Sequence, residues 1–211
     1  MRRLSVAVCL AALVLWTALM GPATSAAAGP PLIESTPTIS ADIPSRVITA
    51  AFPSGEPKPP TITSTAAFMI DAKTGEYLFS QNANARLPMA STTKIMTAIL
   101  ALEALDLDRK VTVSAKAVST IGSKASLVAG ETLTVEQLLY ALMVVSGNDA
   151  SMALAEAVSG NVDTFVERMN AKAKKLGLTN THFVNPCGLN NKKHFSSAKD
   201  LVFLAQYALK N

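Results

Sequence analysis

The folded part of this chain begins with the pattern of a two-stranded hairpin and continues almost entirely in helical patterns. Ala66 to Asp71 and Glu76 to Ser80 are short apolar runs joined by a turn that contains Gly75, which is typical of a β-hairpin. A lone hairpin is only marginally stable, and no later segment clearly predicts a strand that could pair with it. We therefore expect a mixed α/β (α+β) fold whose sheet is incomplete in this chain.

Helical patterns account for most of the remaining residues. An apolar period of 3.6 residues predicts a helix from Ser91 to about Leu105. Thr134 and Gln137 form a capping box ahead of a second helix. The further predicted helices run from about Asp149 to a stop at Gly160, from Asp163 to Gly177, and from Ser197 to the end of the chain.

The first residues have the pattern of an export signal. Arg2-Arg3 precedes an apolar run over residues 4–20, and small residues follow over 23–28. A basic start, a short apolar run and A-x-A-like positions are typical of a cleaved secretory signal. We expect residues 1–28 to be a signal peptide, which places the protein outside the cytoplasm, in the cell envelope. An uncleaved membrane anchor is the alternative, but the run is short for a membrane span.

The next segment, residues 29–63, is rich in Pro, Ser and Thr. Such a stretch buries too little apolar surface to offset the entropy lost when it becomes ordered. Its prolines keep the chain extended. We interpret it as a linker that leads to a folded domain over residues 64–211.

Charge and cysteine content argue against two kinds of partner. The net charge of +4 includes Arg2 and Arg3 of the signal, and the lysines are scattered among acidic residues. A nucleic-acid-binding protein would show a denser basic stripe. Removal of the signal takes away Cys9 and leaves Cys187, and no Cys/His cluster has the spacing of a metal site. We therefore expect no nucleic-acid partner, no metal and no cofactor.

Ser91 and Lys94 form an S-x-x-K pattern at the start of a predicted helix. Residues three apart share a helix face, so the Lys94 amine can lie over the Ser91 hydroxyl. A serine needs a neighbouring base to become nucleophilic, and a buried lysine with a lowered pKa can be that base. The free N–H groups of the helix N-terminus can stabilise developing negative charge. The plain alternative is a helix-capping serine beside a solvated lysine.

A second candidate motif, Ser146-Gly147-Asn148, lies between two predicted helices. A loop between helices can project a hydroxyl and an amide into a cleft. S-x-x-K together with S-D-N and K-T-G is the signature of class A β-lactamases and penicillin-binding proteins. In that scheme Ser146 would relay a proton between Lys94 and the leaving amine, and Asn148 would bind the peptide backbone of the substrate.

Both motifs lie within longer strings that resemble the D-alanyl-D-alanine carboxypeptidases, which are low-molecular-mass penicillin-binding proteins. The resemblance runs from about Ser64 to the C-terminus. It is carried by residues 66–81, 85–98, 130–150, 185–189 and 194–198. The resemblance implies a β-lactamase/transpeptidase-like fold, in which a sheet is flanked by helices and a helical subdomain is present.

The resemblance also implies a reaction. Ser91 would be the acyl-enzyme nucleophile, Lys94 the general base, and Ser146 and Asn148 the second catalytic element. The substrates would be peptidoglycan stem peptides, which lose their terminal D-alanine, and β-lactam antibiotics would act as inhibitors. Membrane attachment of a full-length parent protein is compatible with this family.

The third family motif, a K-T-G on a late strand, is not found in its place. Residues 73–75 spell Lys-Thr-Gly, but they lie upstream of Ser91 in the hairpin turn, where Gly75 suits a positive φ. We expect the motif to lie beyond Asn211, which would make residues 64–211 a partial catalytic domain. Cys187 stands where the family usually has Asp or His, and we interpret this as structural variation.

Other functions remain as alternatives. A β-lactamase would need a glutamate in an E-x-x-L-N-like loop, whereas Glu156 and Glu167 fall within predicted helices. A DD-endopeptidase or transpeptidase would use the same motifs, and a chain without K-T-G could be an inactive fragment. His182 and His194 could suggest a Ser–His–Asp triad, but there is no G-x-S-x-G pattern, so we expect them to be structural.

Overall fold

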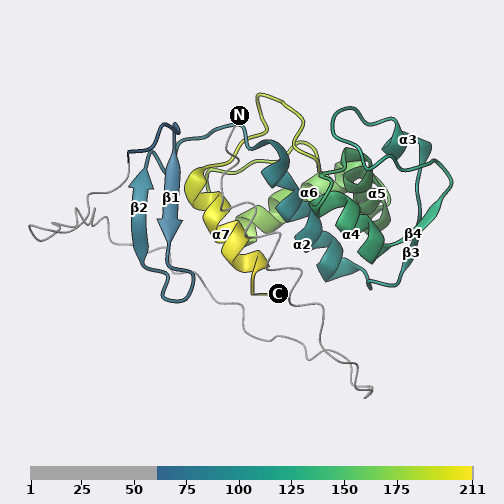
Figure 1. Ribbon diagram of the computed structural model, residues 1–211, viewed down its shortest axis with the longest axis horizontal. Coiled ribbons are helices and arrows are strands. Elements are labelled where there is room, and N and C mark those ends of the chain that lie inside the picture. Colours follow the sequence, from purple (N-terminus) through teal and green to yellow (C-terminus); the bar gives the residue numbers. More distant parts are fainter. Residues whose placement is uncertain (1–60, 211) are drawn as a thin grey trace, which may run out of the picture.

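The computed structural model describes residues 61–210, so the predicted signal peptide (1–28) and nearly all of the predicted linker (29–63) lie outside the described residues. The hairpin lies at one end of the molecule, a second small sheet at the other, and the long helices between them (Figure 1). The elements are β1 (Ala67–Ile70), β2 (Tyr77–Gln81), the 3₁₀ helix η1 (Ala90–Thr93), α2 (Lys94–Ala104), β3 (Lys110–Thr112), α3 (Ala115–Val118), β4 (Thr132–Thr134), α4 (Val135–Met143), α5 (Asn148–Ser159), α6 (Val162–Lys175) and α7 (Ala198–Ala208).

The predicted hairpin is confirmed. Strands β1 and β2 are antiparallel, with Phe68 opposite Ser80. The Asp71 carboxylate accepts hydrogen bonds from the backbone N–H groups of Lys73 and Thr74 at 2.8 and 2.7 Å, which is a local turn that Asp favours. Gly75 closes the turn with a φ of +75°, as predicted.

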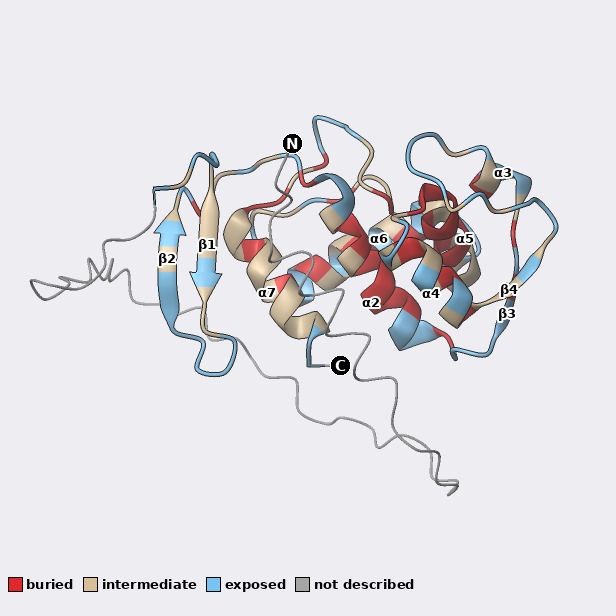
Figure 2. Ribbon diagram, viewed as in Figure 1, coloured by how far each residue is buried: buried red, intermediate tan, exposed pale blue. Residues whose placement is uncertain are grey.

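Helix α7 provides the hairpin's main cover. It packs against β1, where the rings of Phe203 and Phe68 meet edge to face at a centroid distance of 6.2 Å. The apolar hairpin residues remain intermediate or exposed, in contrast to the buried central helices (Figure 2). Tyr77 and Leu78 are 41% and 51% exposed. Within the described residues the hairpin therefore stays less covered than the central helices.

The second sheet was not predicted. Strands β3 and β4 are antiparallel, with Val111 opposite Leu133, and each is only three residues long. Such short strands carry too little alternation to be recognised from the sequence. Val111 and Val113 are nevertheless buried in the core, so the pairing is supported by long-range packing. These strands form a sheet of their own and do not extend the hairpin.

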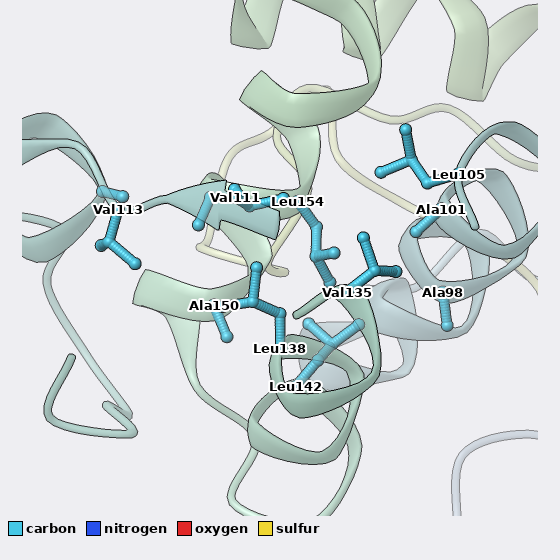
Figure 3. Close-up of a cluster of buried hydrophobic side chains, with 12 residues drawn as sticks. Ala98, Ala101, Leu105, Val111, Val113, Val135, Leu138, Leu142, Ala150 and Leu154 are labelled. Carbon is cyan, nitrogen blue, oxygen red and sulfur yellow. The ribbon is translucent and has the colours of Figure 1, made fainter. Parts of the chain in front are cut away.

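Helix α2 separates two hydrophobic clusters. On one side Ala98 and Ala101 join side chains of α4 and α5. The leucines of those two helices in this cluster are Leu138, Leu142 and Leu154 (Figure 3). On the other side the α2 residues pack against α6 and α7; the buried members of that cluster are Met89, Met96, Ile99, Leu100, Ala155, Phe165, Met169, Ala173, Leu178, Phe183 and Leu204. Both flanks of α2 are therefore packed against other elements, which fixes the position of the helix.

Helix ends follow the predicted chemistry closely. The Thr134/Gln137 capping box is present, and Gly177 has a φ of +72° just after the end of α6. The helix predicted to follow Asp163 begins earlier, because Asn161 is its cap and accepts a hydrogen bond from the Thr164 N–H. The helix predicted from Ser91 starts as the 3₁₀ turn η1 and becomes α-helical at Lys94.

Candidate active site

Ser91 and Lys94 meet where η1 passes into α2. The Lys94 Nζ lies 3.2 Å from the Ser91 Oγ, as the i, i+3 spacing predicted. Ser91 is exposed, whereas Lys94 is only 2% exposed. Ala90, directly before the serine, has a φ of +46°, a conformation that costs a non-glycine residue energy and occurs often at functional sites.

The Lys94 amine is held by two further oxygen atoms. It donates to the Asn148 Oδ1 at 2.8 Å and to the backbone carbonyl of Cys187 at 2.9 Å. Burial lowers the pKa of Lys94 below its ordinary value of 10.5, and this effect is opposed by the charges of Cys187 and Asp149. A buried amine with three oxygen partners does not fit the alternative of a solvated lysine beside a helix cap.

Asn148 begins α5 and connects the lysine to the loop over residues 121–128. Its Nδ2 donates to the Ile121 carbonyl at 2.7 Å, and its backbone N–H donates to the Ser123 carbonyl at 2.7 Å. A Cβ on Gly122 would lie 2.6 Å from that Nδ2. The loop can therefore approach Asn148 this closely only because residue 122 is glycine.

Asp149 fixes the same loop from the next position along α5. Its carboxylate accepts hydrogen bonds from the N–H groups of Ala125 and Leu127, at 2.9 and 3.1 Å, and from Ala150 at 2.9 Å. The side chain is 1% exposed. Asp149 was not predicted as a site residue; an acidic side chain in the first turn of the helix after the S-x-N motif was the available signal.

Ser146 lies in the turn before α5 with a φ of +61°. Its side chain is partly buried. Among the described residues no hydrogen bond joins its hydroxyl to Ser91 or Lys94. The structure thus brings Ser91, Lys94 and Asn148 into direct contact and places Ser146 two residues from Asn148, without a bond to the other three.

The loop over residues 185–189, which was not predicted as part of the site, contacts Lys94 through the Cys187 carbonyl. The Asn185 Oδ1 accepts the backbone N–H groups of Cys187, Gly188 and Leu189 at 3.2, 2.7 and 3.0 Å. The loop is therefore fixed by one amide side chain. Because the contact from residue 187 to Lys94 is made by a backbone carbonyl, it does not depend on the residue type there.

Two more contacts anchor this loop to the core. The Pro186 carbonyl accepts from Thr97 of α2 and Ser151 of α5, both at 2.6 Å. Gly188 has a φ of +90°, and a Cβ there would lie 1.9 Å from the Ala90 carbonyl oxygen. The loop and the turn that carries the serine are thus in direct contact. Burial raises the pKa of the buried Cys187 thiol, and this thiol makes no hydrogen bond to Lys94.

The two histidines do not form a triad with Ser91. His194 is 3% exposed and lies 2.8 Å from the Thr93 hydroxyl. Burial, with a smaller effect from His182, lowers its pKa to about 4. His182 is exposed, bonds the Lys193 carbonyl at 2.6 Å, and stacks on Phe195.

Two kinds of feature are not found in residues 61–210. No group of three or more His, Cys, Asp or Glu side chains is arranged to hold a metal ion. None of the helices there has the length and apolar character needed to cross a membrane.

Comparisons with known proteins agree with this arrangement. A family model described as D-alanyl-D-alanine carboxypeptidase matches residues 54–211. The D-alanyl-D-alanine carboxypeptidase DacF of Bacillus subtilis is 47% identical over 150 residues, which cover 69% of this chain and 39% of that protein.

Solved structures show the same relationship. The D-alanyl-D-alanine carboxypeptidase DacD of Francisella tularensis matches with a TM-score of 0.71 and 38% identity, over 74% of this chain and 39% of that one. The Streptomyces K15 DD-transpeptidase matches with a TM-score of 0.69 and 38% identity, over 73% of this chain and 63% of that one. This confirms the expected transpeptidase-like fold.

The chain spans between 39% and 63% of the lengths of these relatives. The matched segment contains the whole of the described site, from the turn that carries Ser91 to the loop at residues 185–189. The chain belongs to the D-alanyl-D-alanine carboxypeptidase family, whose members act on peptidoglycan in the cell envelope.

Proposed function

We propose that the whole protein is a serine-type D-alanyl-D-alanine carboxypeptidase that removes the terminal D-alanine from peptidoglycan stem peptides. The observation that carries this proposal is the buried Lys94 amine, 3.2 Å from the exposed Ser91 hydroxyl. An exposed nucleophile beside a buried base suits attack on a substrate carbonyl, which would form an acyl-enzyme on Ser91.

The partners of Lys94 favour its role as a base. The Asn148 Oδ1 and the Cys187 carbonyl can only accept hydrogen bonds. A neutral amine has two N–H groups and one lone pair, so bonding to these two oxygens directs the lone pair at the Ser91 Oγ. The lowered pKa of Lys94, caused by burial, favours that neutral state. The lysine would thus accept the serine proton as the oxygen attacks.

The developing oxyanion would form near the N-terminus of η1 and α2. Within residues 61–210 no backbone acceptor takes the Ser91 N–H, which leaves this donor available for an oxyanion. Asn148 has one amide hydrogen beyond the one given to Ile121, and it would bind the substrate backbone. Ser146 would carry the proton to the leaving D-alanine amine, and water would then release the shortened peptide.

The predicted signal at residues 1–28 supports action outside the cytoplasm. Its basic start, apolar run and small-residue site direct a protein to export, and the cell envelope is where peptidoglycan stem peptides occur. On the same proposal β-lactam antibiotics acylate Ser91 and inhibit the protein.

A transpeptidase or endopeptidase is the second candidate, since a DD-transpeptidase is among the similar structures. Its acylation step would use the same residues and differ only in what accepts or leaves the acyl group. A β-lactamase is less well supported. Glu167 is exposed on α6, Glu156 borders a pocket with β3 residues, and neither bonds to a residue of the site.

A labelling experiment on the protein expressed from its whole coding sequence tests the proposal. A fluorescent penicillin should form a stable adduct, and a D-Ala-D-Ala peptide should release D-alanine. Ser91→Ala should abolish both, while Ser80→Ala, a change at an exposed serine of β2, should alter neither. Labelling that persists in Ser91→Ala would show that Ser91 is not the nucleophile. Labelling with exchange of D-alanine for an added amine, but without hydrolysis, would favour the transpeptidase.

A further inference from the structure

His194 is linked to the nucleophile turn by a chain of two hydrogen bonds. Its Nε2 lies 2.8 Å from the Thr93 Oγ1, and the Thr93 Oγ1 lies 2.7 Å from the Ala90 carbonyl oxygen. Ala90 directly precedes Ser91. The buried histidine therefore reaches the turn that carries the nucleophile from a segment about a hundred residues away in sequence.

The direction of each bond follows from the partners at both ends. The Val184 N–H donates to the His194 Nδ1 at 3.0 Å, so Nδ1 carries no proton and the neutral ring has its proton on Nε2. At the other end the Ala90 carbonyl can only accept, so the single Thr93 hydroxyl proton goes to it. Thr93 must then accept from His194. The two deductions agree.

The two hydrogen bonds end at the carbonyl of Ala90, a residue whose backbone is strained. Ala90 has a φ of +46°, and its carbonyl is pressed against Gly188, where a Cβ would lie 1.9 Å from the oxygen. The peptide plane is rigid, so the direction of the Ala90 carbonyl also fixes the direction of the Ser91 N–H. In the described part of the chain no backbone carbonyl accepts the Ser91 N–H.

We propose that His194 is a positioning residue for acylation, which acts through the Thr93 hydroxyl to hold the Ala90–Ser91 peptide so that the Ser91 N–H faces the oxyanion. This inference rests on the proposed function. His194 touches neither Ser91 nor Lys94, so its role differs from that of a general base. It stabilises an unfavourable backbone conformation at the point where a small rotation would misdirect an oxyanion donor.

Two substitutions separate this role from simple support of the core. In His194→Gln the side-chain amide can donate to Thr93 in place of Nε2 but leaves the Val184 N–H without an acceptor. In His194→Asn the amide oxygen can accept from Val184 in place of Nδ1 but loses the donor to Thr93. His182→Asn, the same change at the exposed histidine, is the matched control.

A positioning role and simple support of the core predict opposite orders for the acylation rates of His194→Asn and His194→Gln. For a positioning residue, His194→Asn lowers the acylation rate constant with penicillin by about tenfold to a hundredfold, as misplacement of a reacting group does, while His194→Gln retains most of the rate. Thermal stability should follow the reverse order, because an unpaired buried N–H is costly. Thr93→Val should act like His194→Asn, and Thr93→Ser should retain the rate. Acylation rates that simply follow thermal stability would overturn the proposal.

A second measurement does not depend on activity. The amide ¹H–¹⁵N resonance of Ser91 should shift in His194→Asn and Thr93→Val, and stay in place in His194→Gln and His182→Asn. An unchanged Ser91 resonance in Thr93→Val would refute the positioning role even if the protein reacts with penicillin. A wild-type protein that fails to react with penicillin, yet shows these shifts, would refute the proposed function and leave the His194–Thr93–Ala90 linkage supported.

Discussion

Gly188 and Ala90 lie so close together that position 188 has no room for a side chain. An added Cβ would lie 1.9 Å from the Ala90 carbonyl oxygen and 3.0 Å from the Ser91 nitrogen. The loop at residues 185–189 therefore limits where the nucleophile turn can lie. Because the same loop presents the Cys187 carbonyl to Lys94, one segment contacts both the turn of Ser91, the proposed nucleophile, and Lys94, its proposed base.

Gly188→Ala should strongly impair acylation, because the methyl group must displace the Ala90–Ser91 peptide. The positive φ of +90° adds backbone strain on the order of 1–3 kcal/mol. Penicillin acylation rates and thermal unfolding measure the two effects. Gly160→Ala is the control, since Gly160 also has a positive φ but nothing within 4 Å. Equal acylation rates in these two variants would contradict the positional role of Gly188.

Lys94→Arg should lose acylation even though it keeps the positive charge. Arginine stays protonated at all accessible pH values, so it cannot accept the serine proton, and loss of a general base commonly costs about 10²–10⁴ in rate. Stopped-flow acylation by a chromogenic cephalosporin measures this. Lys174→Arg, on the surface of α6, is the control. A Lys94→Arg protein with near-normal rates would show that another group takes the proton.

Acylation should accelerate as pH rises through the pKa of Lys94. Burial places that pKa below 10.5, and the proposed reaction needs the neutral amine, so the rate should fall on the acid side of the pKa and be constant on the alkaline side. Asp149 raises the pKa of Lys94, and Asp149→Asn should therefore move the midpoint to lower pH. Asp163→Asn, at an exposed position of α6, should not. A midpoint that moves to higher pH would contradict the assigned charge effect.

Asp149→Asn should also destabilise the fold. The two carboxylate oxygens accept hydrogen bonds from the Ala125 and Leu127 N–H groups. The amide of asparagine has only one accepting oxygen, so its NH₂ group would lie against the second backbone N–H and leave that N–H unpaired. The expected loss in the free energy of unfolding is about 1–3 kcal/mol. Urea denaturation measures it, and hydrogen exchange should accelerate in residues 121–128. Exchange that accelerates elsewhere but not in this loop would argue against the anchoring role.

Acid should destabilise the protein partly through His194. Its folded-state pKa is lowered to about 4 from an ordinary value of 6.5, so the unfolded chain binds the proton more readily. Stability from the neutral ring is complete above about pH 6.5 and is lost as pH falls toward 4, by up to about 3 kcal/mol. Unfolding free energies across this range should fall less steeply for His194→Gln than for wild type. Parallel slopes would show that His194 protonates freely in the folded protein.

Local features of this protein were predictable from its sequence. The hairpin turn at Gly75, the Thr134/Gln137 capping box and the approach of Lys94 to Ser91 all depend on residues within four positions of one another. Short-range geometry of this kind is set by helix and turn spacing alone. The family strings around Ser91 and Ser146 likewise carried the correct family assignment.

Contacts between distant segments were decided only by the tertiary structure. The pairing of β3 with β4, the Cys187 carbonyl on Lys94 and the link from His194 to Thr93 each join residues about twenty to a hundred positions apart. The contact from residue 187 to Lys94 uses a backbone carbonyl, which every residue type has, so no residue type marks it in the sequence. The sequence by itself determined which side chains could react, because that depends on residue type and local spacing. Their arrangement depends on how the two cores pack on either side of α2, because only that packing brings residues 121–128 and 185–189 to the start of the helix.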